Sequence, residues 1–170
     1  MADASPALLE RLREIFDARD RANMQPTIDA FLAVLDEHPD VPEVLYEVGG
    51  AYDTAGEEDT ALGYYERALA AGLTGETLRK CLLQQGSTLR VLGRFDESVA
   101  VLDRARAEFP DSDSVRLAHA LSLHAAGRSD GAVAELMELV LDRVRTPEVL
   151  RYEASMRGNA AYLAGLDAAR

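Results

Sequence analysis

Apolar residues recur along this chain at intervals of three and four, which places them on one face of successive α-helices. The clearest example has two stripes, Leu82, Gly86 and Leu89, then Phe95, Val99, Leu102 and Ala105. Gly93 lies between the stripes, where a residue that can adopt positive φ favours the end of a helix. Asp96 and Glu97 follow at once, where acidic side chains suit the first turn of a helix. The pattern predicts two antiparallel helices joined by a tight turn.

The same pattern occurs several times. Turn glycines stand at Gly56, Gly93 and Gly127, which are 37 and 34 residues apart. Three further columns keep this spacing: Ala61, Ser98 and Ala132; Tyr65, Leu102 and Leu136; Ala68, Ala105 and Leu139. Stepping back another 34 residues reaches Thr27, Phe31 and Val34. Since one hairpin cannot bury both of its faces, such units are expected to stack in series.

A helical hairpin of about 34 residues with these columns resembles the tetratricopeptide repeat. The strings GRFDESVAVLDRARAEFP and GEEDTALGYYERALAAG carry the resemblance most specifically, and it covers about residues 25–145. The resemblance, which is to small stand-alone bacterial members, implies an all-α fold: a right-handed superhelical α-solenoid of about four hairpins with a C-terminal capping helix. We expect one domain over 1–170, with units at 8–41, 42–75, 76–112 and 113–146 and a final helix at 147–168.

The two ends are less regular. The first helix has its stripe at Leu8, Leu12, Ile15 and Phe16, whereas the repeat columns would hold Arg11 and Glu14. We therefore expect this helix to be rotated and to act as a cap. The stretch 158–165 looks like the first helix of a further unit, and a lone helix there is expected to cover the last apolar face.

Composition narrows the function further. The 170 residues are 48% apolar and 28% charged, which excludes wholesale disorder and a membrane-spanning protein. No apolar run approaches a membrane span, the N-terminus lacks the features of a secretory signal, and the single Cys fits a reducing cytoplasm. The net charge of −12 disfavours nucleic acid and anionic membranes as partners. The segment from Asp29 to Glu76 contains 12 acidic residues and only one basic residue, and the segment that follows it is mildly basic.

Residue patterns typical of enzymes are missing. The sequence has no phosphate-binding glycine loop, no His-Glu-x-x-His pattern and no Gly-x-Ser-x-Gly elbow. Cys81 is interpreted as a small buried apolar residue, and His119 and His124 lie about 140° apart around a helix, so they cannot share a metal ion. The run Glu57-Glu58-Asp59 suits a helix start. We expect no catalytic residues, no metal and no cofactor.

The resemblance implies that the first helix of each unit lines a concave groove for a partner peptide or helix. The residues expected there are Tyr46, Lys80, Leu83, Gln84, Ser87, Arg90, Leu117, Leu121, His124, Asn159 and Tyr162. The family's clamp for a C-terminal carboxylate needs Lys and Asn at columns that here hold Tyr46 and Gly50, then Leu83 and Ser87. A clamp of that kind is therefore not expected.

Two functions remain. The first is a protein-interaction module without catalysis, in which Tyr46, Leu117 and Leu121 receive an apolar anchor of an unknown protein or peptide, and Lys80 and Arg90 hold an acidic neighbour. The alternative is a structural, self-assembling scaffold of otherwise unknown function, a homo-oligomer formed through Leu9 and Phe16 of the first helix.

Overall fold

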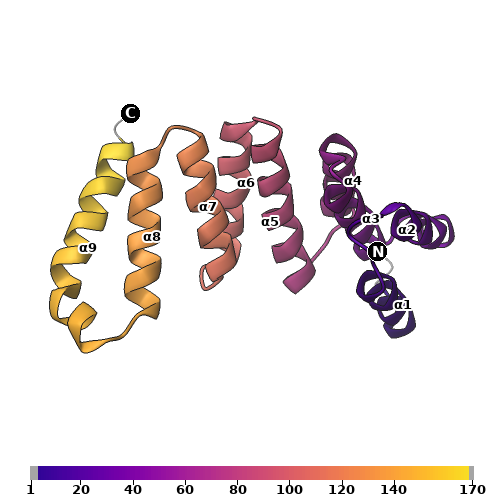
Figure 1. The fold of residues 1–170 in the computed structure, drawn as a ribbon, viewed down its shortest axis with the longest axis horizontal. Coiled ribbons are helices and arrows are strands. Elements are labelled where there is room, and N and C mark those ends of the chain that lie inside the picture. Colours follow the sequence, from indigo (N-terminus) through magenta and orange to yellow (C-terminus); the bar gives the residue numbers. More distant parts are fainter. Residues whose placement is uncertain (1–3, 169–170) are drawn as a thin grey trace. The chain divides into compact units, whose positions relative to one another are not determined.

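The computed structural model describes residues 4–168, which form nine α-helices in two compact units divided between Leu92 and Gly93 (Figure 1). The first unit contains α1 (Pro6–Asp17), α2 (Gln25–Glu37), α3 (Pro42–Ala55), α4 (Glu58–Ala70) and α5 (Gly75–Val91). The second contains α6 (Phe95–Glu108), α7 (Asp113–Ala125), α8 (Ser129–Arg143) and α9 (Pro147–Ala168). Within each unit, helices that follow one another in sequence pack together, as the hydrophobic pattern predicts.

Helix starts follow from local residues. The Ser5 hydroxyl accepts a hydrogen bond from the Leu8 amide at 3.2 Å, and the Ser112 hydroxyl accepts one from the Val115 amide at 3.4 Å. Each bond satisfies an amide that a helix start would otherwise leave unpaired. Proline occupies the first turn of α1, α2 and α3, where its missing N–H costs nothing.

The predicted turn glycines are confirmed. Gly56, Gly93 and Gly127 all have positive φ, between 75° and 80°. After Gly56, the amide of Glu57 donates to the carbonyl of Tyr52 at 3.0 Å, which closes the C-terminus of α3. The amide of Arg128 repeats this bond to Leu123 at 2.8 Å. The repeat therefore uses one left-handed glycine turn to reverse the chain.

The first unit has a large apolar core. Its most deeply buried side chains come from three successive helices: Phe31, Val34, Val44, Val48 and Tyr65. Cys81 of α5 is fully buried and its thiol lies 3.8 Å from the Tyr65 carbonyl oxygen, which confirms its interpretation as a small core residue. On α1, Leu8 and Leu12 pack into this core. The expected stripe on the first helix thus holds for Leu8, Leu12 and the partly buried Ile15, whereas Phe16 is exposed.

The second unit buries charge as well as apolar surface. One apolar cluster contains Val99, Leu123 and Ala132, and Leu102 and Val115 are fully buried. Beside it, Arg116 is buried and its guanidinium lies 3.1 Å from Glu135 and 2.7 Å from Asp142. The imidazole of His119 lies between two carboxylates, 3.1 Å from Asp103 and 3.7 Å from Glu135. His119 is therefore a buried structural residue, and its environment is ionic.

The final helix departs from the sequence-based expectation in one respect. As predicted, α9 is a single helix, and it continues through Gly158 and Gly165. We expected it to cover the last apolar face, but Val133, Leu136 and Val140 of α8 stay exposed. The physical reason is that α9 turns small and charged residues toward α8, including Ala160 and Arg157. Arg157 forms ion pairs with Glu138 and Asp142, and these hold α9 in place without covering the apolar stripe.

Candidate protein-interaction surfaces

Helix α7 of the second unit presents an apolar face. Leu117 and Leu121 of α7 are 47% and 55% exposed, and they lie one helical turn apart. His124, three residues after Leu121, is exposed on the same face. The opposite side of α7 carries the buried Arg116 and His119. Packing of α7 into its unit therefore leaves the predicted contact residues accessible to a partner.

On α9, the predicted residues Asn159 and Tyr162 are both exposed. They occupy adjacent turns of one face, because positions three apart in a helix are neighbours. Tyr162 offers an aromatic ring with a polar hydroxyl, the type of side chain that is enriched at protein interfaces. The structure thus leaves these two side chains free to meet a ligand, and their role stays a prediction.

The predicted apolar anchor point in the first unit is different. Tyr46 of α3 is buried, and its ring centroid lies 6.1 Å from that of Tyr65. Burial raises the pKa of Tyr46 to about 12, helped by the charge of Glu47, while a hydrogen bond with the Gln84 side chain opposes the shift. The sequence placed Tyr46 beside the buried stripe, whereas the structure makes it part of the core. It presents little surface for a peptide to contact.

Polar residues surround Tyr46 at the surface of the first unit. Lys80 of α5 is exposed, whereas Leu83, Gln84, Ser87 and Arg90 are partly buried. Burial raises the pKa of Glu47 to about 7, and the positive charges of Lys80 and Arg19 oppose that shift. The Nε atom of Arg90 is buried and has no hydrogen-bond partner among the described residues. Lys80 is thus accessible to an acidic ligand residue, and the role of both basic residues stays a prediction.

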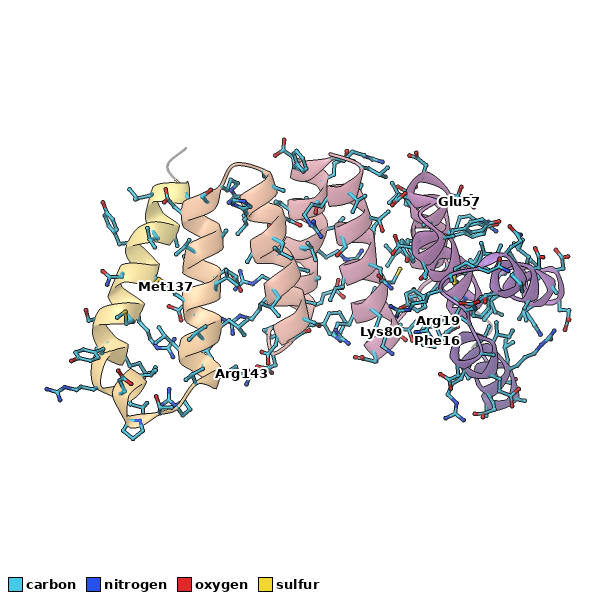
Figure 2. All side chains as sticks on the ribbon, viewed as in Figure 1. Phe16, Arg19, Glu57, Lys80, Met137 and Arg143 are labelled. Atoms are coloured by element: carbon cyan, nitrogen blue, oxygen red, sulfur yellow. The ribbon has the colours of Figure 1, made fainter. Side chains whose placement is uncertain are left out.

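The residues predicted for self-assembly lie on α1. Leu9 and Phe16 are both exposed. The guanidinium carbon of Arg19 stands 3.6 Å from the centre of the Phe16 ring, so one face of the ring already has a cationic neighbour (Figure 2). This contact leaves Leu9 as the more accessible apolar residue. Self-assembly through α1 stays a prediction.

Sequence reasoning missed an apolar groove between α8 and α9. The groove has a volume of about 500 Å³. Its lining is almost entirely apolar: Val133, Leu136, Met137, Val140, Leu141, Val149, Tyr152 and Met156, with Glu148 as the charged member. Met137 lies on the side of α8 that faces α9 (Figure 2). The signal in the sequence is the spacing of Val133, Met137 and Val140, which places three apolar residues on one side of α8 beside the repeat columns.

Residues 4–168 contain no group of three or more His, Cys, Asp or Glu side chains arranged to hold a metal ion. None of the helices in that range is both long enough and apolar enough to cross a lipid bilayer.

Antiparallel helix pairs with a glycine turn and small residues at the helix crossings define an α-helical repeat protein. The chain belongs to the tetratricopeptide repeat family, whose sequence profile matches residues 42–163. Its fold is similar to that in the crystal structure of MamA, with a TM-score of 0.62 and 18% identity over 96% of this chain and 93% of that one. No curated protein matches the sequence at a significant level. Proteins of this family generally mediate protein–protein interactions.

Proposed function

We propose that this chain is a protein-interaction module that binds a peptide or helix of a partner protein without catalysis. The observation that carries the proposal is the apolar face of α7, where Leu117 and Leu121 are exposed one turn apart. Two leucines in this arrangement fit an apolar side chain that projects from an extended peptide or from an amphipathic helix. The backbone below them is rigid, because the other side of α7 is held by the ion pairs of Arg116.

The first unit would contribute charge to the same function. Lys80 is exposed on α5, and Arg90 lies on the same helix with its Nε atom unpaired. An acidic ligand side chain would accept a charge-assisted hydrogen bond from the exposed ammonium group of Lys80, and such bonds are stronger than neutral ones. A ligand segment that carries an acidic residue is therefore the best fit to the basic residues of α5.

Selection from a phage-displayed peptide library would test the α7 face. Peptides selected on the wild-type protein should bind Leu117→Glu/Leu121→Glu at least about tenfold more weakly, because two carboxylates replace the apolar contact. The matched control is Ala100→Glu/Ala107→Glu on the exposed side of α6, which adds the same charge elsewhere in the unit. Equal binding to wild type and both variants would remove α7 from the proposed site.

The basic residues need a separate variant. Lys80→Glu/Arg90→Glu should weaken those selected peptides that carry acidic residues and leave neutral ones unaffected, since only the former use charge. The loss should shrink as salt is raised, because salt screens exposed charges. Binding that is independent of both salt and this double substitution would assign the ligand to α7 alone.

A further inference from the structure

Apolar columns of the repeat are buried in α4 and α6 but exposed in α8. Tyr65 and Leu102 occupy the same column as Leu136, at spacings of 37 and 34 residues. The first two side chains are fully buried, whereas Leu136 is 41% exposed. The neighbouring column behaves alike, since Leu62 and Val99 are buried and Val133 is exposed. The face of α8 is thus built as a packing surface, and no described helix covers it.

The uncovered face has the pattern of a helix–helix interface. On α8, Val133, Met137 and Val140 follow at spacings of four and three, and Val144 comes four residues later, directly after the helix. On α9, Val149, Tyr152 and Met156 follow at spacings of three and four. These are the spacings of the contact positions of a coiled coil. Two such ridges side by side form one half of a four-helix bundle. Tyr and Met, which line the groove from α8 and α9, are also residue types enriched in interface centres.

We propose that this face, defined by the exposed apolar residues of α8 and α9, binds the same face of a second copy of the chain. The contact would be two-fold symmetric, with two α8–α9 pairs packing into a four-helix bundle. A two-fold contact uses one self-complementary patch on both copies and is the commonest arrangement among homo-oligomers. The proposal is independent of the α7 surface, which lies on a different helix of the unit.

The exposed area is sufficient for a dimer. Six large apolar side chains on this face are between 38% and 52% exposed: Val133, Leu136, Val140, Val144, Tyr152 and Met156. Together they offer roughly 500 Å² on each copy. Two copies would bury about 1,000 Å², the lower bound for a specific interface. An apolar patch of this size is also at the upper end of what monomers expose.

The charge distribution favours this face over α1 for self-association. Residues 1–92 contain 8 basic and 17 acidic side chains, for a net charge of −9, whereas residues 93–170 contain 10 and 13, for a net charge of −3. A contact through α1 would bring the two more acidic units together. Contact through α8 and α9 brings together the units with the smaller net charge, so electrostatic repulsion opposes it less.

Sedimentation equilibrium of the full chain over about 1–200 μM tests the proposal. We expect the wild type to reach twice the monomer mass of 18.5 kDa. Leu136→Glu/Val140→Glu should stay monomeric, with a dimer dissociation constant raised at least about 100-fold, because carboxylates would be buried in the contact. Ala100→Glu/Ala107→Glu carries the same added charge and should still dimerise. Circular dichroism checks that each variant keeps its helix content; Tyr152→Arg, at an exposed position of α9, replaces the double variant if it does not.

Three outcomes would overturn the proposal. The first is a wild type that remains monomeric throughout the concentration range. The second is a dimer that survives Leu136→Glu/Val140→Glu or Tyr152→Arg in a folded variant but is lost in Leu9→Glu/Phe16→Glu, which would place the contact on α1. The third is a mass that keeps rising beyond two copies, since a two-fold contact closes after one association.

Discussion

The ring of Tyr65 packs directly against the backbone of Gly49. A Cβ atom built at position 49 would lie 2.8 Å from both Cδ1 and Cε1 of the ring, closer than such atoms approach. Tyr65 is fully buried, and its hydroxyl donates a hydrogen bond to Asp53 at 3.2 Å, so the ring is fixed on both sides. The crossing of α3 and α4 therefore depends on the missing side chain at position 49.

Gly49→Ala should destabilise the first unit by about 2 kcal/mol, because the ring of Tyr65 has no free space to move into. The matched control is the adjacent Gly50→Ala. A Cβ atom at position 50 meets no atom within 4 Å, and Gly50 lies inside α3. Alanine is the better helix former, so this variant should gain about 0.5–1 kcal/mol. Urea unfolding followed by circular dichroism measures both.

The two neighbouring glycines thus predict changes of opposite sign for the same substitution. A stabilising Gly49→Ala would show that Tyr65 can shift away from α3. A destabilising Gly50→Ala would show that the space beside position 50 is not free in the folded protein.

Asp53 joins three helices of the first unit. Its carboxylate accepts hydrogen bonds from Tyr65 of α4 at 3.2 Å and from Thr88 of α5 at 3.1 Å. Tyr65→Phe removes one donor and leaves the partly buried carboxylate with a single side-chain partner. We expect the free energy of unfolding to fall by about 1–2 kcal/mol, typical of a hydrogen bond to a charged group. Urea unfolding again provides the measurement.

Tyr162→Phe is the appropriate control for the loss of a tyrosine hydroxyl. Tyr162 is exposed on α9, so the change should stay within about 0.5 kcal/mol. A Tyr65→Phe variant as stable as wild type would mean that water replaces the lost donor at Asp53.

The sequence was sufficient to predict the conformation or burial of residues whose role depends on local helix geometry. Gly56, Gly93 and Gly127 were recognisable because a left-handed turn needs glycine, and Tyr65 and Leu102 because they recur at helical spacing. The surface was harder to predict. Leu136 keeps the column of Tyr65 but is exposed, since burial depends on what packs above a helix and not on the helix itself. Conversely, Tyr46 looked like a surface residue and is buried.

Glu47 should make the stability of the first unit depend on pH. Burial raises the pKa of Glu47 from 4.5 to about 7, against the charges of Lys80 and Arg19. Between these two values the folded chain binds a proton that the unfolded chain releases. As far as this group is concerned, the free energy of unfolding should therefore be highest below about pH 4.5. It should fall by about 3 kcal/mol as the pH rises through 7.

Glu47→Gln should remove that slope and stabilise the protein at pH 8, because a neutral amide replaces a partly desolvated carboxylate. Urea unfolding at intervals between pH 5 and 8 measures the effect, with Glu66→Gln, an exposed position on α4, as the control. Parallel pH profiles for wild type and Glu47→Gln would show that the carboxylate of Glu47 is ionised in the folded protein throughout.

The last prediction concerns the buried pair Arg116 and Glu135. Arg116 stands in the column that holds Leu45 and Leu82 in the other repeats, and Glu135 in the column of Tyr64 and Val101. Burial opposes ionisation of Glu135, yet the neighbouring His119 imidazole, the charge of Arg106 and the hydrogen bond from Arg116 lower its pKa overall.

Arg116→Leu removes one cation and leaves Glu135 and Asp142 with fewer partners, so it should destabilise the second unit by about 3 kcal/mol. Arg116→Leu/Glu135→Val introduces the residues of the equivalent columns and should recover at least half of that loss, because a buried ion pair can often be replaced by apolar side chains. Arg104→Leu breaks only the exposed pair with Glu108 and should change stability by less than about 0.5 kcal/mol. A double variant no more stable than Arg116→Leu alone would mean that His119 and Arg106 require the carboxylate of Glu135 independently of Arg116.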